Sequence, residues 1–339
     1  MIGWGVVGAG WVARDFVLPA IAAARDAHLV GVHDRDPAAL HGITPTFERL
    51  EDLLAAPGLD AVYVATPNHA HAPVVQAVAA AGVPVLCEKP LANDVPTAKE
   101  MVAATAGLLA GTAFDQRFHP AHEAIAAMVA HGELGVVTTV RIVYGCWLPP
   151  DWASPVGRRS AAGLDPEARR RDNWRVDPAR AGGGAMIDLA PHGIDLTGRI
   201  LGEDLVDLVA LTATRVHDYA DPAADDTAVL AGRTASGTLL SHHVSFSTAD
   251  PLPRRRLEVV GTRAQLVAED TLGQDPGGTL TRIDAVTGAP APVPFDTGAG
   301  PFIRQLAAFG AAVRAVAPWP YPLDRDLALH ALLMEAACP

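Results

Sequence analysis

The sequence predicts an α/β domain with a doubly wound parallel sheet over residues 1–117, followed by an α+β domain with a largely antiparallel open sheet over residues 118–339. Up to about residue 117, short apolar runs alternate with segments of helical periodicity, which is the pattern of βαβ units. Beyond that point, strand-like segments follow one another across short turns, which is typical of antiparallel pairing. A chain of 339 residues is long enough for two domains that each bury a core.

The first domain is expected to begin with a strand, and strands then alternate with helices along the chain. Its strands are short continuous apolar runs, as expected where both faces of a parallel sheet are covered. The predicted strands are residues 2–7, 28–32, 61–65 and 83–87, and the predicted helices are residues 12–24, 70–81 and 94–108. Asn93 or Asp94 is available to cap the last of these helices.

The second domain is expected to begin with a helix over residues 121–131 and a strand over residues 136–147. A long loop rich in Pro, Gly and Arg follows over residues 148–183. Further strands are predicted at residues 205–217, 227–233, 238–246, 256–260 and 265–268, and the tail is predicted to be helical over residues 302–316 and 323–336.

The composition excludes several classes of protein. No apolar run reaches the ~20 residues needed to span a bilayer, and no basic segment typical of a signal peptide precedes the first strand. A net charge of -12 disfavours nucleic acids and anionic membranes as partners. Cys87, Cys146 and Cys338 are scattered without the spacing of metal ligands, so we expect no metal site and a cytoplasmic location.

A glycine-rich turn follows the first predicted strand and opens the first predicted helix. Gly8, Gly10 and Ala13 form the G-x-G-x-x-A pattern, with Trp11 and Val12 inside it. The first glycine allows a tight turn, the second lets the backbone approach a pyrophosphate, and the alanine lets the helix pack on the strand. In this context the pattern predicts a Rossmann domain that binds a dinucleotide, whereas a tight turn that binds nothing is the alternative.

Asp34 follows the second predicted strand, where an acidic residue receives the ribose hydroxyls of NAD and repels the 2′-phosphate of NADP. The neighbouring Arg35 opposes this inference, because a guanidinium would bind that phosphate. We therefore expect NAD as the cofactor, with NADP as the less favoured alternative.

With these residues in view, the chain resembles the Gfo/Idh/MocA family of oxidoreductases, which includes glucose–fructose oxidoreductase and inositol dehydrogenase. The resemblance rests on the glycine turn, on the Ala-Thr-Pro-Asn-His-Ala-His sequence at 65–71, on Glu-Lys-Pro at 88–90, and on the Gly-rich segment at 182–188 that leads to His192. One departure is Ala190, where the family usually has glycine. The resemblance implies an NAD(P)-dependent oxidoreductase that acts on the CH–OH group of a sugar, cyclitol or related polyol.

Oxidising a secondary alcohol needs a base for the hydroxyl proton and a positive group beside the developing oxyanion. Lys89 is expected at the carboxyl end of a strand, where open α/β sheets bind ligands, and is one of only two lysines among 26 basic residues. Asp188 and His192 are four residues apart and share a face if the segment is helical, although Pro191 could kink that helix or start it. The resemblance makes His192 the proton acceptor and Asp188 a ligand of substrate hydroxyls.

The resemblance also implies further contacts. Residues expected to border the cofactor are Thr66, Pro67, Asn68, His71, Glu88, Lys89 and Gln116, and residues expected to contact substrate are Lys89, Trp174, Asp188 and His192. The plainer alternatives are that Pro67-Asn68 only starts a helix and that a lone histidine is structural. Residues 158–180 carry seven arginines against four acidic residues, which indicates either a contact with an anionic substrate or a solvated loop.

Two other functions remain open on the residues alone. One is an enzyme that retains NAD and oxidises its substrate transiently to hydrolyse or eliminate a glycoside. The other is a non-catalytic NAD-binding regulator, which has no need of Lys89, Asp188 and His192. We also expect a homodimer or homotetramer, because an antiparallel sheet with helices on one face leaves its other face open.

Overall fold

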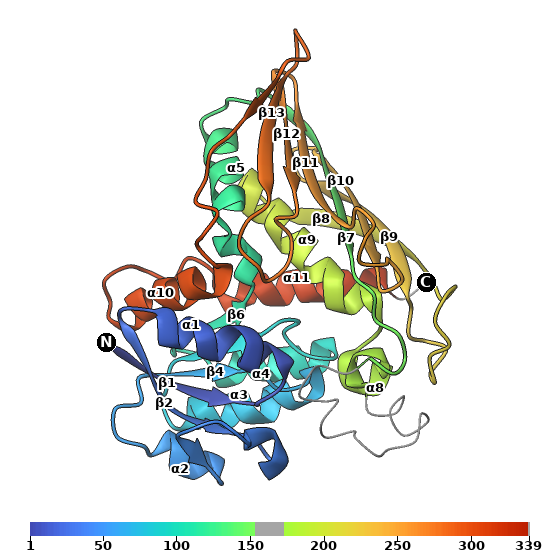
Figure 1. The fold of residues 1–339 in the computed structure, drawn as a ribbon. Helices are drawn as coiled ribbons and strands as arrows, with labels where there is room; N and C mark the ends of the chain where they lie inside the picture. Colours follow the sequence, from blue (N-terminus) through green and yellow to red (C-terminus); the bar gives the residue numbers. More distant parts are fainter. Residues whose placement is uncertain (153–172, 338–339) are drawn as a thin grey trace. The chain divides into compact units, whose positions relative to one another are not determined.

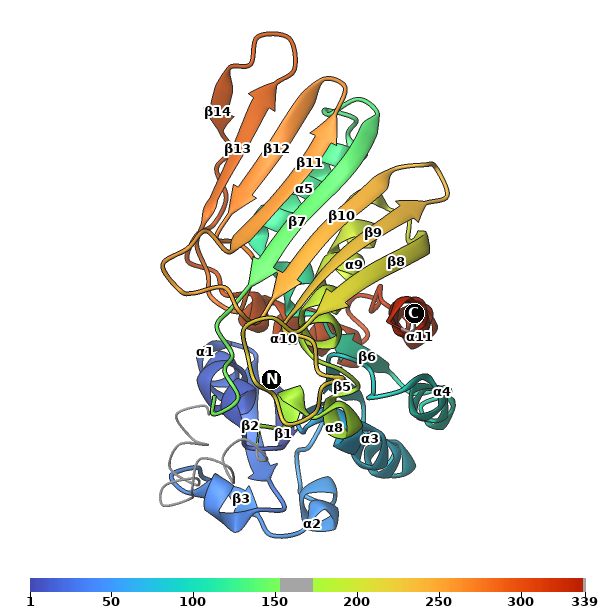
Figure 2. The same cartoon turned by 90° about the vertical axis from the view of Figure 1, so that its right-hand side faces the viewer.

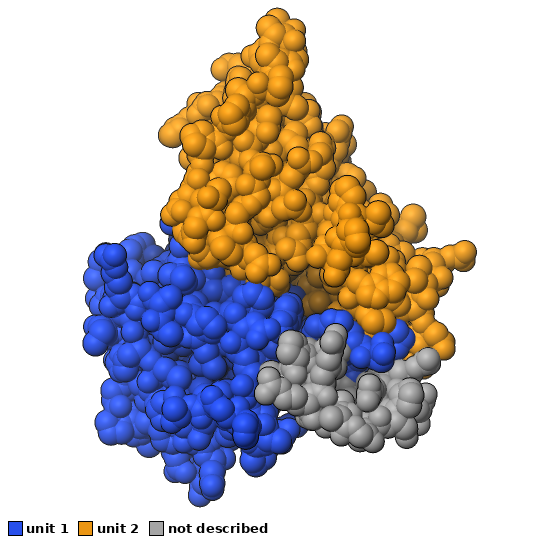
Figure 3. Space-filling view, viewed as in Figure 1, with its two compact units in different colours: residues 1–113, 150–182, 302–328 blue, residues 114–149, 183–301, 329–339 orange. Residues whose placement is uncertain are grey.

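The computed structural model describes residues 1–152 and 173–337. The chain forms two compact units, coloured in Figure 3. Unit 1 comprises residues 1–113, 150–182 and 302–328, and unit 2 comprises residues 114–149, 183–301 and 329–339. The units are interleaved in sequence, so the division into domains 1–117 and 118–339 stays a prediction.

Unit 1 contains a six-stranded, fully parallel sheet with the order β3-β2-β1-β4-β5-β6 (Figure 1). The strands are β1 (Ile2–Val7), β2 (Ala27–His33), β3 (Thr46–Phe47), β4 (Ala61–Val64), β5 (Val85–Glu88) and β6 (Ala110–Ala113). The predicted parallel sheet is confirmed. The short strands β3 and β6 escaped prediction, because two residues carry no periodicity and Ala-Gly-Thr-Ala is hardly apolar.

The helices of unit 1 include the three that the sequence predicts over residues 12–24, 70–81 and 94–108, and one at residues 50–54 that it does not predict. They are α1 (Leu18–Ala23), α2 (Leu50–Leu54), α3 (His71–Ala80), α4 (Val95–Ala104), α8 (Pro178–Ala181) and α10 (Pro301–Val313), and α11 (Leu323–Ala336) contributes residues to both units. A π-helical turn, Ala13–Val17, leads into α1. The Asp94 carboxylate caps α4 by accepting a hydrogen bond from the Thr97 amide at 2.7 Å. The loop predicted over residues 148–183 is wrong in part, since it contains α8.

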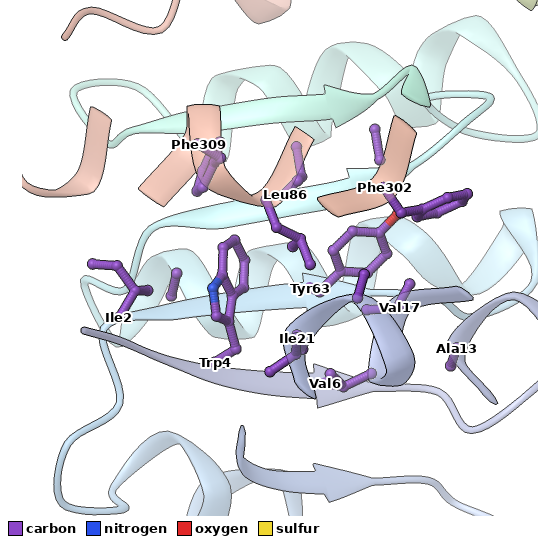
Figure 4. Close-up of a cluster of buried hydrophobic side chains, with 14 of the residues drawn as sticks. Ile2, Trp4, Val6, Ala13, Val17, Ile21, Tyr63, Leu86, Phe302 and Phe309 are labelled. Carbon is purple, nitrogen blue, oxygen red and sulfur yellow. The ribbon is translucent and has the colours of Figure 1, made fainter. Parts of the chain in front are cut away.

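The core of unit 1 shows why the last third of the chain belongs to it. Side chains of β1, α1 and β4 pack together with Phe302, Leu306 and Phe309 of α10 in one buried cluster (Figure 4). The Trp4 and Phe309 rings lie 5.8 Å apart. A second cluster, which contains α3, α4 and Leu323, covers the other face of the sheet. Helices therefore cover both faces, as the continuous apolar strands require.

Unit 2 contains an eight-stranded sheet with the order β14-β13-β12-β11-β7-β10-β9-β8 (Figure 2). The strands are β7 (Val137–Gly145), β8 (Leu205–Ala213), β9 (Thr227–Thr234), β10 (Leu239–Ser245), β11 (Arg255–Gly261), β12 (Ala264–Glu269), β13 (Thr279–Asp284) and β14 (Pro290–Pro292). All neighbours are antiparallel except β7 and β10, which confirms the largely antiparallel prediction. β13 and β14 were not predicted.

Two helices of unit 2, α5 (Pro120–Ala130) and α9 (Ala185–Leu201), lie on one face of this sheet (Figures 1 and 2). β9 alternates strictly between buried and exposed residues, which is the signature of a sheet with one covered face. α9 is buried along most of its length because it packs on both the sheet and α5. Pro191 lies inside α9, so the expectation that the helix might start at this proline is wrong.

Candidate functional site

The glycine turn of unit 1 has the backbone that its sequence requires. Gly8 has φ +96°, and a Cβ there would lie 2.6 Å from the Ala65 carbonyl oxygen. A Cβ at Gly10, in contrast, would meet no atom of the described chain within 4 Å. Gly8 is therefore required by close packing, whereas Gly10 leaves the backbone open to a ligand. The Arg14 amide donates to the Gly10 carbonyl oxygen at 3.0 Å, so the first helix starts directly at this turn, and a helix N-terminus suits a pyrophosphate.

Asp34 is fixed directly beside this turn. Its carboxylate oxygens accept hydrogen bonds from the Ala9 amide at 2.7 Å and from the Asp36 amide at 2.8 Å. The negative charge therefore lies at the end of β2, next to the glycine turn. This is where Rossmann domains bind the ribose hydroxyls of a dinucleotide. The adjacent Arg35 is exposed.

Arg14 stabilises the same turn through hydrogen bonds. The sequence analysis did not predict this role. Its guanidinium donates to the carbonyl oxygens of Ala9, Ala39 and His41. These bonds join the start of the first helix to the segment after β2. Only the position of Arg14, one residue after the G-x-G-x-x-A pattern, hinted at this role.

An aromatic cluster lies beside the glycine turn within unit 1. Trp11 contacts Phe16 and Trp152 edge-on, with ring centroids 5.4 and 5.7 Å away. The Arg175 guanidinium lies 4.5 Å from the Trp174 ring, 5.1 Å from Trp152 and 5.7 Å from Trp11. The structure thus brings the predicted residues Trp11 and Trp174 to the same cation. Trp152 was not predicted as a site residue, and Arg175 was considered only as one of the seven arginines of residues 158–180.

The turn after β4 is tied to its surroundings through side chains. The Asn68 side-chain amide donates to the Ala181 carbonyl oxygen at 2.8 Å, which anchors α8. The fully buried His71 ring lies 3.0 Å from the Thr66 carbonyl oxygen on one side and 3.1 Å from that of Pro90 on the other. Burial lowers the pKa of His71 to about 4, so the ring is neutral at pH 7. Asn68 and His71 therefore shape the turn, and a direct contact of Thr66, Pro67, Asn68 or His71 with cofactor stays a prediction.

Glu88 and Lys89 lie at the carboxyl end of β5, as predicted. The Glu88 carboxylate accepts hydrogen bonds from the Tyr63 hydroxyl at 2.6 Å and from the Lys89 amide at 3.2 Å. Burial raises the pKa of Glu88 above its ordinary value. Tyr63 and Glu88 thus fix the backbone from which the half-buried Lys89 projects. The sequence did not indicate this role of Tyr63, because the residue lies in a strand of otherwise apolar residues.

In unit 2, α9 carries Asp188 and His192 one helical turn apart, so the predicted shared face is confirmed. Asp188 is half-buried, whereas the His192 ring is buried against the edges of Phe114 and Tyr144, with centroids 6.1 and 5.9 Å away. The His192 Nδ1 atom lies 3.8 Å from the buried Asp115 carboxylate. This histidine is thus held in a fixed orientation beside a negative charge.

Gln116 is also in unit 2 and is 1% exposed. Neither its amide nitrogen nor its amide oxygen has a hydrogen-bond partner within residues 1–152 and 173–337. A buried amide without partners is uncommon, and such groups mark places where a water or ligand binds. This observation fits the predicted cofactor contact of Gln116, which stays a prediction.

Some predicted features fall outside these clusters. Arg158, Arg159, Arg169, Arg170 and Arg171 of the arginine-rich segment, and Cys338, lie outside the described residues. Within the described ranges, no group of three or more His, Cys, Asp or Glu side chains is arranged to hold a metal ion. None of the helices in these ranges is both long and apolar enough to cross a membrane.

A parallel sheet of this order, with an open glycine turn after β1 and an acidic residue after β2, defines a dinucleotide-binding protein of the Rossmann class. Comparison with known families leads further. Residues 2–108 match the NAD-binding Rossmann domain of an oxidoreductase family, and residues 122–267 match the GFO/IDH/MocA C-terminal domain. The chain belongs to the GFO/IDH/MocA family of oxidoreductases, as its resemblance predicted.

Individual relatives are similar over nearly the whole chain. The 1,5-anhydro-D-fructose reductase of Ensifer adhaerens is 30% identical over 91% of this chain and 87% of its own. The aldose-aldose oxidoreductase of Caulobacter crescentus, solved with glycerol, is 24% identical with a TM-score of 0.82 over 99% and 97% of the two chains. A levoglucosan dehydrogenase, solved with NADH and levoglucosan, is 21% identical with a TM-score of 0.81 over 99% and 97%. These two solved structures share the fold of this chain.

Proposed function

We propose that this oxidoreductase transfers a hydride between a nicotinamide cofactor and a secondary alcohol or ketone of a sugar, cyclitol or related polyol. The observation that carries the proposal is the complete proton-transfer set, Lys89, Asp188 and His192, in a chain whose glycine turn is open to a dinucleotide. The reductase from Ensifer adhaerens, which acts on an anhydro sugar according to its name, supports this substrate class.

In the proposed reaction, His192 takes the proton of the reacting hydroxyl. The Asp115 carboxylate, 3.8 Å from Nδ1, stabilises the imidazolium that results. Asp188 accepts hydrogen bonds from substrate hydroxyls. Lys89 supplies the positive charge that stabilises the developing oxyanion. The bound nicotinamide supplies the hydride acceptor or donor.

NAD is the proposed cofactor, and NADP is the less favoured alternative. The Asp34 carboxylate is held by two backbone amides and thus cannot easily move away from a ligand at the end of β2. A 2′-phosphate at that position would meet a fixed negative charge. The exposed Arg35 is the group that would oppose this preference.

The experiment that tests the proposal is a screen of sugars and cyclitols with NAD, followed through the absorbance of the reduced nicotinamide. Accumulation of NADH in proportion to oxidised product supports the proposed dehydrogenase. Consumption of a glycoside without net NADH indicates the cofactor-retaining alternative. Tight NAD binding without turnover of any substrate indicates the non-catalytic regulator.

We also propose that the protein is a homodimer or homotetramer that works in the cytoplasm. The uncovered face of the unit 2 sheet exposes large apolar side chains, with Leu211 80%, Val209 62% and Val229 53% exposed. A patch of neighbouring apolar residues on β8 and β9 favours a protein partner, and a second copy is the simplest one. The buried Cys87 forms no disulfide, which fits a reducing compartment. Light scattering that shows only monomer at micromolar concentration contradicts the oligomer.

A further inference from the structure

The start of α9 depends on a residue that is distant in sequence. The helix begins after Gly184, which has no side chain to cap the first amides. Asp225 occupies this position instead. Its carboxylate accepts hydrogen bonds from the amides of Gly184 at 3.1 Å and Met186 at 2.9 Å, and its carbonyl oxygen accepts one from Ala185 at 2.9 Å. One residue thus satisfies three consecutive amides of the first turn.

The approach of Asp225 explains why Gly184 is a glycine. A Cβ at residue 184 would lie 2.1 Å from the Asp225 carbonyl oxygen and 2.5 Å from its amide nitrogen. Both are backbone atoms, which do not yield as the end of a side chain does. The backbone of the helix start and the backbone of residue 225 are therefore in direct contact.

Asp225 is itself held firmly by its neighbour. The Asp226 carboxylate accepts hydrogen bonds from the amides of Arg215, Val216 and His217 at 3.0, 2.6 and 3.0 Å. The Asp226 carbonyl oxygen accepts another from Phe246 at 2.8 Å. The pair thus connects the start of α9 to the ends of β8, β9 and β10.

This arrangement is not explained by stability alone. Asp225 is 7% exposed, and burial raises its pKa from 3.8 to about 6, with the adjacent Asp226 adding to the rise. The hydrogen bonds therefore do not fully offset the cost of burying the charge. A neutral group in this place would cost the folded state less.

We infer that Asp225 is a positioning residue, which holds the first turn of α9 so that Asp188 and His192 keep a fixed place on unit 2. Asp188 follows the last capped amide by two residues, and its own amide donates to the Gly184 carbonyl oxygen at 3.1 Å. A shift of the helix start moves both side chains together. This inference rests on the roles proposed above for Asp188 and His192.

The test compares Asp225→Asn and Asp225→Ser with wild type. Asparagine keeps the size of the side chain but replaces one acceptor oxygen by an NH₂ group, which faces an amide N–H and repels it. Serine retains one neutral acceptor. Asp221→Asn is the matched control, because Asp221 is exposed and its carboxylate accepts a hydrogen bond from the nearby Ala223 amide, far in sequence from α9.

Five quantities are measured on the full-length protein: kcat, KM, the NADH dissociation constant, Tm and amide hydrogen exchange at the start of α9. For Asp225→Asn we expect kcat to fall ~10- to 100-fold, since small misplacements of catalytic groups have effects of this size. We expect exchange of the Gly184 and Met186 amides to accelerate ~10-fold. The NADH dissociation constant and Tm should stay unchanged, because the loss of one acceptor is offset by the removal of a buried charge. Asp225→Ser should lie between wild type and Asp225→Asn in kcat.

Several outcomes overturn the inference. Wild-type kcat and exchange in Asp225→Asn show that the cap does not position the helix. A fall in Tm that accounts for all lost activity in both variants shows a purely structural role. If the wild type turns over no polyol, the proposed function fails, whereas accelerated exchange at α9 in Asp225→Asn would still support the cap.

Discussion

The glycine turn of unit 1 and the start of α9 in unit 2 are both backbone sites, but they are built differently. The turn is held by Asp34, only 25 residues after its partner Ala9, within one βαβ unit. The start of α9 is held by Asp225, 41 residues after Gly184, and the middle of the helix by Arg117, 78 residues before Asp195. The first site is a local motif that a sequence displays directly, whereas the second depends on long-range contacts.

The largest expected effect concerns the buried ion pair of unit 2. The Arg117 guanidinium donates two hydrogen bonds to Asp195 of α9, at 2.8 and 2.7 Å, and both side chains are almost fully buried. Arg117→Ala leaves a buried carboxylate without its cation and should lower the free energy of unfolding by ~3–5 kcal/mol. Arg233→Ala, which breaks an exposed pair with Asp207, should cost less than ~1 kcal/mol. Equal effects in urea unfolding would contradict this contrast.

The next largest effect is expected at Lys89 and His192, where substitutions should lower kcat without weakening cofactor binding. Lys89→Ala and His192→Ala should each lower kcat by ~10²-fold or more, because each removes a group that acts on the reacting hydroxyl. The dissociation constant of NADH should stay within about twofold of wild type, because the glycine turn and Asp34 are untouched. Lys99→Ala is the control, since Lys99 is the other lysine and is exposed on α4. Near-normal turnover in either variant would refute the role assigned to that residue.

A smaller effect is expected at Asp34, beside the glycine turn of unit 1. Asp34→Ala removes both the proposed ribose acceptor and the bond to the Ala9 amide, and should weaken NADH binding ~10-fold, equivalent to ~1.4 kcal/mol. Binding of NADPH should weaken less or improve, since a repulsive charge is removed. Titration of both cofactors with wild type and variant measures the difference. A wild-type preference for NADPH would mean that Arg35 outweighs Asp34.

The smallest effect concerns a buried histidine that packs on α9. His242 is fully buried, neither ring nitrogen has a hydrogen-bond partner within the described part of the chain, and a Cβ on Gly193 would touch its ring. Because burial lowers the pKa of His242 to about 3, only the unfolded chain takes up a proton there between pH ~6.5 and ~3. His242 therefore contributes a loss of stability as the pH falls through this window, by up to ~1.4 kcal/mol per pH unit.

His242→Leu should remove this contribution and stabilise the protein by about 1 kcal/mol at pH 7, because no buried polar atom remains unpaired. Urea unfolding at pH 7 and pH 5.5 measures both values. Two other buried histidines, His122 with a pKa near 3 and His71 with one near 4, remain in the variant and keep part of the acid sensitivity. An unchanged difference between the two pH values would show that His242 does not contribute.

The site residues that could be predicted share one property. In each case the functional side chain and the element that positions it lie in the same short segment of the chain. Lys89 follows an apolar strand directly, and a strand of a parallel sheet ends where ligands bind. Tyr63, Arg14 and Asp115 support the proposed site residues through contacts between separate segments, and each reads as an ordinary strand, helix or turn residue in the sequence. Asp225 and Asp226 are adjacent acidic residues in the sequence, but nothing near them in the chain indicates that they contact the start of α9.

By itself, the sequence determined the parallel sheet of unit 1, the glycine turn, the acidic residue beside it and the helical spacing of Asp188 and His192, because periodicity and turn chemistry act over a few residues. Tertiary structure alone decided that α10 completes the core of unit 1, that α8 is anchored by Asn68, and that α9 starts where Asp225 accepts its amides. These features depend on which distant segments meet when apolar surfaces are buried and buried backbone amides find acceptors. Such pairings are properties of the folded chain as a whole, and no local stretch of sequence contains them.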